Sequence, residues 1–282
     1  RGNGSVSFRT RSLAGRWSSW HDAAPEDDGP DAGTHEPRGR GWELGSPYWT
    51  GPSDWIQVRT FGRVTRVRAF YVRSRATKRP LRTVSMAGSP LILSRAAWGA
   101  SERIRRGRPD YADSLRFAVV HHTAGSNSYT RARSASIVRG IQRYHVLANG
   151  WDDIGYSFLV DKYGQIFEGR FGGVDRNVVG AHAQGFNQGS TGVALIGNYD
   201  ATSATPAAKA ALTRLLAWRL DVAHVDPTTT FSWRSTGNPK FPAGRTITLR
   251  TIAGHRDTGY TACPGSNLYG ALPSLTLGVA QT

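Results

Sequence analysis

The residue that most clearly could do chemistry is Cys263, the only cysteine in the 282-residue chain. It stands in GHRDTGYTACPG, after His255 and directly before Pro264. A single cysteine excludes a disulfide within the chain, which leaves a buried apolar side chain, a nucleophile or a metal ligand. A cysteine hydrolase would pair Cys263 with His255, but this stretch supplies no evident third group to orient the histidine.

A second candidate histidine lies at the end of another apolar stretch. SLRFAVVHHTAG has the pattern of a centrally buried strand. Side chains alternate along a strand, so His121 shares a face with Phe117 and Val119 while His122 points to the other side. RTITLRTIAGH predicts a further strand that carries His255 at its end.

Two strand-end histidines and one cysteine could form a zinc site with three protein ligands. Such a site leaves the fourth position open for water, as catalytic zinc sites do. The spacing alone does not decide between zinc and structural imidazoles, because the two histidines lie far apart in the sequence and no local ligand pair accompanies them.

Strands and helices alternate from Leu91 onward and would position these groups. ARSASIVRGIQRYHVL has apolar residues at helical spacing, and TPAAKAALTRLLAWRLDVAH predicts a helix with Thr205 as N-cap and Pro206 in the first turn. YSFLVDKYGQIFEGR predicts two strands around a turn, and STGVALIGNYD predicts another buried strand. We therefore expect an α/β fold with a mixed central sheet flanked by helices.

The first 88 residues have a different texture and predict a small all-β module. SVSFRTR, DWIQVRTFG and VTRVRAFYV alternate as strands do, and residues 24–41 form a polar loop rich in proline and glycine. Residues 77–90 resemble a linker, so we predict two domains, 1–88 and 91–282. Five tryptophans of this module could be core or a sugar-stacking surface, and we expect core: Trp17, Trp20, Trp42, Trp49 and Trp55.

The chain is strongly basic, with a formal net charge of +16. The charge is spread along the sequence, which favours a polyanionic partner such as a cell-wall polymer about as much as nucleic acid, with a merely solvated arginine-rich surface as the third interpretation. The aromatic residues are not interleaved with basic ones in an RNA-binding signature, so we expect no nucleic-acid partner. No apolar run is long enough to predict a membrane span.

Four stretches together resemble a known family. VVHHTAG, DIGYSFLVDKYGQIFEGR, VGAHAQGFNQGSTGVALIGNYD and IAGHRDTGYTACPG occur in the order and at about the spacing of the type 2 N-acetylmuramoyl-L-alanine amidase and peptidoglycan recognition protein family. The similarity extends from Leu91 to Leu277, and residues 1–88 resemble, more loosely, the β-rich extension of some secreted actinobacterial members. The resemblance implies zinc-dependent hydrolysis of the amide between the lactyl group of N-acetylmuramic acid and L-alanine in peptidoglycan. A non-catalytic protein that binds peptidoglycan is the alternative.

The resemblance also implies roles for individual residues. The positions that match the family's zinc ligands are His121, His255 and Cys263. Tyr156 and Thr261 match the positions that assist catalysis. Some members carry a lysine in place of Thr261 and a glutamate where this chain has Ala194, so an acid or base role must rest on Tyr156, Thr261 and water. The retained cysteine favours catalysis, because members that only bind peptidoglycan have typically lost it.

Substrate contacts follow from the same resemblance. His182 and Asn187 match positions that line the family's cleft. Arg170 and Arg176 are candidates for holding the carboxylates of the stem peptide. A peptidoglycan substrate implies that the protein is secreted or lies in the cell wall, although no signal peptide is visible in the first residues.

Overall fold

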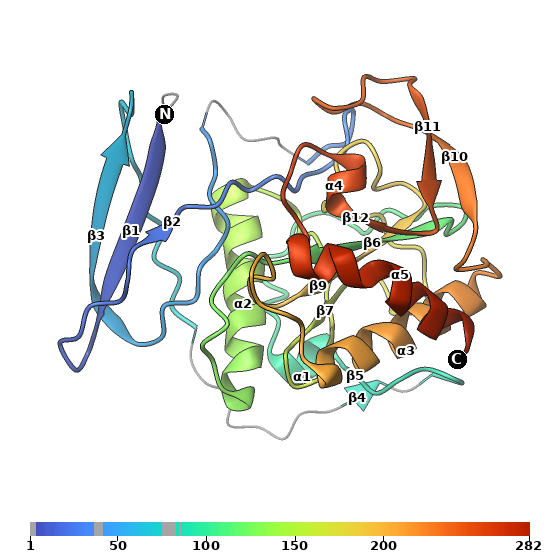
Figure 1. The fold of residues 1–282 in the computed structure, drawn as a ribbon, viewed down its shortest axis with the longest axis horizontal. Helices are drawn as coiled ribbons and strands as arrows, with labels where there is room; N and C mark the ends of the chain where they lie inside the picture. The colour runs from blue at the N-terminus through green and yellow to red at the C-terminus, as the bar shows by residue number, and fades with distance from the viewer. Residues whose placement is uncertain (1–3, 37–41, 75–82, 85) are drawn as a thin grey trace.

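The computed structural model describes residues 4–36, 42–74, 83–84 and 86–282. Figure 1 shows a three-stranded sheet on one side of a larger layered body in which helices cover a central sheet. A long segment between β2 and β3 crosses from the small sheet to the larger body.

The central sheet has seven strands in the order β12-β6-β9-β7-β8-β5-β4 within the described residues. Its strands are β4 Thr83–Val84, β5 Ile92–Leu93, β6 Phe117–His122, β7 Phe158–Val160, β8 Ile166–Glu168, β9 Ser190–Leu195 and β12 Ile252–Gly254. The pairs from β12 to β7 are parallel, and β5 pairs in parallel with β8. Two pairs, β7 with β8 and β4 with β5, are antiparallel. This mixed sheet confirms the predicted fold class.

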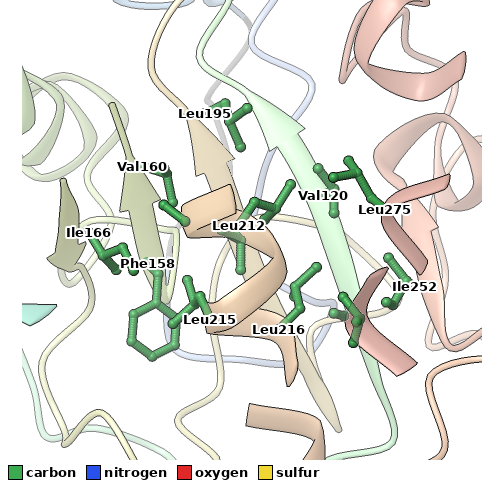
Figure 2. Packing of buried hydrophobic residues seen from close by; sticks show 14 of the residues in the cluster. Val120, Phe158, Val160, Ile166, Leu195, Leu212, Leu215, Leu216, Ile252 and Leu275 are labelled. Carbon is green, nitrogen blue, oxygen red and sulfur yellow. The ribbon is translucent and has the colours of Figure 1, made fainter. Parts of the chain in front are cut away.

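Helices cover both faces of this sheet. The helices are α1 Arg95–Trp98, α2 Ser134–Tyr144, α3 Pro206–Val222, α4 His255–Thr258 and α5 Ser266–Ala280. Leucines of α3 and α5 pack onto β6, β7 and β9 in the largest apolar cluster, which Figure 2 shows around Leu212, Leu216 and Val120. Residues of α1 and α2 pack with Leu159 and Phe167 in a second cluster, so the strands that carry the site are held from both sides.

Strand β6 follows the predicted alternation. Ala118 and Val120 belong to the cluster beneath α3 and α5. Phe117 and Val119 face the other way and pack with Phe186 beside the hairpin formed by β10 Thr230–Arg234 and β11 Thr246–Arg250. The register therefore directs His121 away from the apolar layer under α3.

The helix starts agree with the sequence patterns. The Thr205 hydroxyl accepts a hydrogen bond from the Ala208 amide at 3.1 Å, and Pro206 begins α3. The amphipathic segment forms α2 and continues into a π-helical turn, His145–Asn149. The stretch predicted as one strand through His255 is instead two, β11 and β12, because the chain passes from the hairpin to the central sheet at Thr251.

The N-terminal sheet has the order β2-β1-β3 and is antiparallel. Its strands are β1 Ser5–Ser12, β2 His21–Asp22 and β3 Ser53–Phe61. The predicted third run, residues 64–72, is wrong as a strand: beyond Phe61 the chain has left the ladder with β1, and Phe70 packs edge-on against Tyr144 instead.

The expectation that the tryptophans form a core is also wrong. Trp17 is 38% exposed and Trp55 is 61% exposed, and the other three are half-buried. Arginines stack on four of them, as Arg9 does on Trp17 and Trp20, whereas Trp49 packs against the second apolar cluster.

The predicted linker, residues 77–90, lies partly outside the described residues. Within it, β4 pairs with β5 and belongs to the central sheet, so this part of the stretch is not a free connection. The division into domains 1–88 and 91–282 stays a prediction.

Candidate metal centre

Three buried side chains from separate parts of the sequence meet at one point. One ligand atom each from His121, His255 and Cys263 lie within 4.8 Å of one another. Nδ1 of His121 lies 3.7 Å from Sγ of Cys263, and the two imidazole centroids are 4.5 Å apart. Two nitrogens and one sulfur at this separation could hold a zinc ion.

The sheet brings the two histidines together. His121 ends β6 with His122, and His255 directly follows β12. These strands are parallel neighbours, with Gly254 opposite Val120, so their carboxyl ends lie side by side.

The loop after α4 returns Cys263 to the same place. The Arg256 amide donates to the Cys263 carbonyl at 2.9 Å, and the Cys263 amide donates to Thr261 Oγ1 at 3.0 Å. The His122 amide lies 3.3 Å from Sγ, where it donates to the sulfur. Helix α5 begins only at Ser266, so Cys263 lies before the helix rather than in its first turn.

Burial sets the protonation states of the three ligands. It lowers the pKa of His121 and of His255 to about 3, and in each case a neighbouring histidine adds to the effect. Both rings are therefore neutral at pH 7 and offer lone pairs. Burial, together with the Asp28 carboxylate, raises the pKa of the Cys263 thiol well above its ordinary value, so a metal ion must displace a proton there.

His182 lies directly behind His121. Its Nδ1 is 3.1 Å from Nε2 of His121, and a proton on Nε2 of His121 would leave Nδ1 free as a ligand. Glycine is required around this ring, because a Cβ at Gly180 or Gly192 would lie 2.4 Å from it. The His182 ring is completely buried. Its assignment to substrate contact stays a prediction, whereas its contacts in the structure are those of a residue that orients His121.

Tyr156 lies beside the histidines and Thr261 beside the cysteine. The Tyr156 ring centroid is 5.4 Å from that of His121. Burial and then the nearby carboxylates raise the pKa of Tyr156 well above its ordinary value, so it is a hydrogen-bond donor at neutral pH. Ala194, where some family members have a glutamate, stands opposite His121 in the pairing of β9 with β6. That position therefore lies next to a candidate metal ligand.

An acidic residue from the N-terminal part, which the sequence analysis missed, occupies the same site. Oδ1 of Asp28 lies 3.3 Å from Nδ1 of both His121 and His255. Its other oxygen, Oδ2, accepts a hydrogen bond from the Tyr156 hydroxyl. The sequence does mark this stretch as unusual. Four acidic residues fall within six positions of a chain with a net charge of +16: Glu26, Asp27, Asp28 and Asp31.

The predicted substrate residues have different surroundings. Asn187 is buried and donates from Nδ2 to the Gly29 carbonyl and the Asp31 carboxylate. Arg170 forms a buried ion pair with Glu36. Arg176 is exposed and its guanidinium lies 3.7 Å from the ring centroid of Tyr111. Asn187 and Arg170 thus contact carboxylates of the connection between β2 and β3, and Arg176 lies on the loop beside Tyr111.

The chemistry of the residues at this centre fits a zinc ion. Asp28 Oδ1 and His255 Nδ1 are buried and have no hydrogen-bond partner among the described residues. A buried oxygen and a buried nitrogen that lie 3.3 Å apart are costly unless a proton or a metal cation lies between them. Thiolate and imidazole ligands are the usual donors of protein zinc sites.

Comparison with known proteins identifies the family. Residues 111–266 match the family model described as N-acetylmuramoyl-L-alanine amidase, more than half of the chain. The chain belongs to this amidase family. Asp28 and the acidic residues near it in the sequence precede the matched region.

Curated relatives of this amidase-family chain include both recognition proteins and amidases. Peptidoglycan-recognition protein SC2 of Drosophila melanogaster is 33% identical over 178 residues, which span 63% of this chain and 82% of that protein. The N-acetylmuramoyl-L-alanine amidase of Homo sapiens is 42% identical over 131 residues, which span 45% of this chain and 21% of that protein.

Solved structures agree with the family and the fold. Wild-type Drosophila PGRP-LB matches with a TM-score of 0.51 and 28% identity, covering 65% of this chain and 92% of that one. The ectodomain complex of the recognition proteins LCa and LCx with bound tracheal cytotoxin matches with a TM-score of 0.52 and 27% identity, covering 64% of this chain and 93% of that one. Among the described residues, no helix is long and apolar enough to span a membrane.

Proposed function

We propose that the chain is a zinc-dependent N-acetylmuramoyl-L-alanine amidase, which hydrolyses the amide between the lactyl group of N-acetylmuramic acid and L-alanine of the stem peptide. The observation that carries this proposal is the convergence of His121, His255 and Cys263 at the ends of two neighbouring parallel strands and the following loop. The family match and the relatives named as amidases support the reaction class.

A zinc ion bound by these residues would polarise the scissile carbonyl and lower the pKa of water. The chain's own groups would then orient and stabilise the reacting atoms. Tyr156, held as a phenol, would donate a hydrogen bond to the oxyanion that develops on the carbonyl. His182 would keep His121 in the tautomer that leaves Nδ1 free.

The substrate-binding groups fit an acidic stem peptide. Asn187 and Arg170 carry amide and guanidinium donors, and each already holds a carboxylate of the chain itself. We propose that they hold stem-peptide carboxylates in the same way. Thr261 fixes the loop of Cys263 through its hydrogen bond to the Cys263 amide, and we assign it an additional contact with the oxyanion.

Peptidoglycan is the proposed partner, and a secreted or cell-wall location follows from it. The net charge of +16 would favour retention on an anionic cell-wall polymer. The exposed aromatic and arginine side chains of the N-terminal sheet, such as Trp55 with Arg11, add to that surface.

The second candidate function is peptidoglycan binding without cleavage. Two observations favour it: relatives of similar identity are named recognition proteins, and Ala194 stands beside His121 where some members have a glutamate. A cysteine hydrolase is the weaker rival, because burial raises the pKa of the Cys263 thiol and so disfavours the nucleophilic thiolate.

The test is hydrolysis of a defined muramyl peptide, followed by mass spectrometry of released L-alanyl peptides. Because Asp28 lies in the site, the intact chain and Asp28→Ala are both assayed, with zinc and with chelator. The same assays are repeated with Cys263→Ala added to each. Release that requires zinc and Cys263 supports the amidase. Binding of the muramyl peptide without release by any zinc-loaded form would make the protein a recognition protein, and release that survives chelator but not thiol alkylation would indicate a cysteine hydrolase.

A further inference from the structure

The long connection between β2 and β3 folds back on itself next to its acidic residues. The Glu26 amide donates to the Leu44 carbonyl at 2.8 Å, and the Ser46 amide donates to the Ala24 carbonyl at 2.7 Å. Residues 44–46 are fixed to α2, because Tyr144 Oη donates to the Gly45 carbonyl at 2.6 Å. This pairing presents residues 26–31, which we name the acidic segment, to the metal centre.

The carboxylate of Asp28 adjoins the two candidate histidine ligands of that centre. Its side chain is only 6% exposed, and Oδ1 lies at the same distance, 3.3 Å, from Nδ1 of His121 and of His255. No described donor satisfies Oδ1, although Tyr156 satisfies Oδ2. Together with Sγ of Cys263 and the two imidazole nitrogens, this oxygen would bring the number of ligands to four, the coordination number of closed zinc sites.

Two carboxylates that follow Asp28 in the sequence hold the groups proposed to bind the stem peptide. Oδ1 of Asp31 accepts from the Gly185 amide and from Nδ2 of Asn187, both at 2.7 Å. Further along, Glu36 pairs with Arg170 and accepts from the Asp152 amide at 2.9 Å. The chain thus places its own carboxylates where an acidic peptide would be held.

We propose that Asp28 is a fourth metal ligand and that the acidic segment keeps the amidase site closed in the intact chain. A catalytic zinc site needs one position that water or substrate can occupy. With Asp28 bound, that position is filled, and the segment must withdraw before a stem peptide can enter. The coordination does not depend on the proposed function, whereas its consequence for catalysis rests on it.

The test measures whether the metal has an accessible fourth position. The full chain, Asp28→Ala and Asp28→Asn are loaded with Co²⁺ and titrated with azide while the visible absorption is recorded. Asp54→Asn is the matched control, because it removes the same charge from an exposed ion pair with Arg11 on the N-terminal sheet. Thermal unfolding checks that each variant is folded. If Asp28→Ala is unfolded, the azide titration of Asp28→Asn, which preserves the shape of the side chain, decides whether the fourth position is filled.

We expect azide to change the spectra of both Asp28 variants and to leave wild type and Asp54→Asn unchanged. Zinc affinity, measured by competition with a chromophoric chelator, should fall at least about 10-fold in Asp28→Ala, since loss of an outer-shell partner already costs roughly 10- to 100-fold. Equal azide binding by wild type and Asp28→Ala would overturn the proposal. So would a zinc affinity that Asp28→Ala leaves unchanged.

Hydrolysis of the muramyl peptide by the same four proteins separates the two proposals. Faster release of L-alanyl peptide by both Asp28 variants than by wild type supports closure by the acidic segment. Equal release by all four overturns closure. If none releases peptide while azide distinguishes the variants as expected, the proposed amidase function fails and the coordination by Asp28 stands.

Discussion

The candidate histidine ligands and the carboxylate of Asp28 come from two regions that are held in place by different kinds of contact. His121 and His255 stand at the ends of strands whose neighbours pack into a continuous apolar layer, with Val120 and Ile252 completely or almost completely buried. Asp28 stands in an irregular connection that is held by polar contacts with the site itself.

This difference predicts different behaviour for the two regions. The strand ends are fixed by packing that does not involve the site, so they should keep their geometry when the site changes. The connection that carries Asp28 and Glu36 owes much of its position to contacts with the centre and with Arg170, so it should move when those contacts are removed.

The largest effect should come from the region fixed by packing. We expect Cys263→Ser to lower hydrolysis by at least about 10³-fold, because it removes a zinc ligand, and loss of a single stabilising donor alone costs about 10²–10³-fold. Zinc content by mass spectrometry and peptide release in the Asp28→Ala background check this. Full zinc occupancy with normal release would show that the strand-end site is not the catalytic metal centre.

The next effect concerns the hydroxyl shared by the two regions. Tyr156→Phe, also made in the Asp28→Ala background, should lower kcat by about 10²-fold and leave zinc bound, as expected for a lost oxyanion donor. Tyr129→Phe is the matched control, since Tyr129 is another buried tyrosine whose hydroxyl donates to the Ile196 carbonyl. A loss of similar size in both variants would assign the effect to packing rather than to the reaction.

A smaller effect should follow when only the attachment of the connection is weakened. Glu36→Gln removes the ion pair with Arg170 without touching the metal ligands. We expect hydrogen exchange at the Asp152 and Gly185 amides to accelerate roughly 10-fold, because both amides donate to carboxylates of the connection. Unchanged exchange, with exposed Glu43→Gln as control, would mean that the connection is held as firmly as the strands.

The smallest effect separates the two arginines predicted to bind substrate. Arg170→Ala in the Asp28→Ala background should raise KM by about 10-fold or more, since a hydrogen bond to a charged group contributes about 1.5–3 kcal/mol. Arg176→Ala should change KM less than about 2-fold, because Arg176 is exposed and stacks on Tyr111. Equal increases in KM for the two variants would extend the substrate site to the Tyr111 loop.

The sequence predicted the regions whose positions depend on apolar periodicity. The alternation through Phe117, Val119 and His121 gave the correct faces of β6, and Thr205 and Pro206 marked the start of α3. The three candidate metal ligands, which the structure brings together, stand beside such patterns and in stretches that resemble the family's motifs.

The remaining features depend on tertiary contacts that no local pattern encodes. The acidic segment has no periodicity. Its place is fixed by the pairing with residues 44–46 and by tertiary contacts such as those with His121, Tyr156 and Asn187. Residues 64–72 alternate as a strand does, yet the ladder with β1 ends at Phe61. Tryptophans are apolar enough to form a core, but the N-terminal sheet has three strands and few apolar side chains that could bury them.

The most direct measurement is anomalous diffraction at the zinc edge from crystals of the intact chain. We predict one peak bound by Nδ1 of His121, Nδ1 of His255, Sγ of Cys263 and Oδ1 of Asp28. A peak at the three strand-end and loop ligands with Asp28 displaced from the metal would contradict the closed state. A peak elsewhere, or none in a zinc-loaded crystal, would contradict the metal centre on which the account rests.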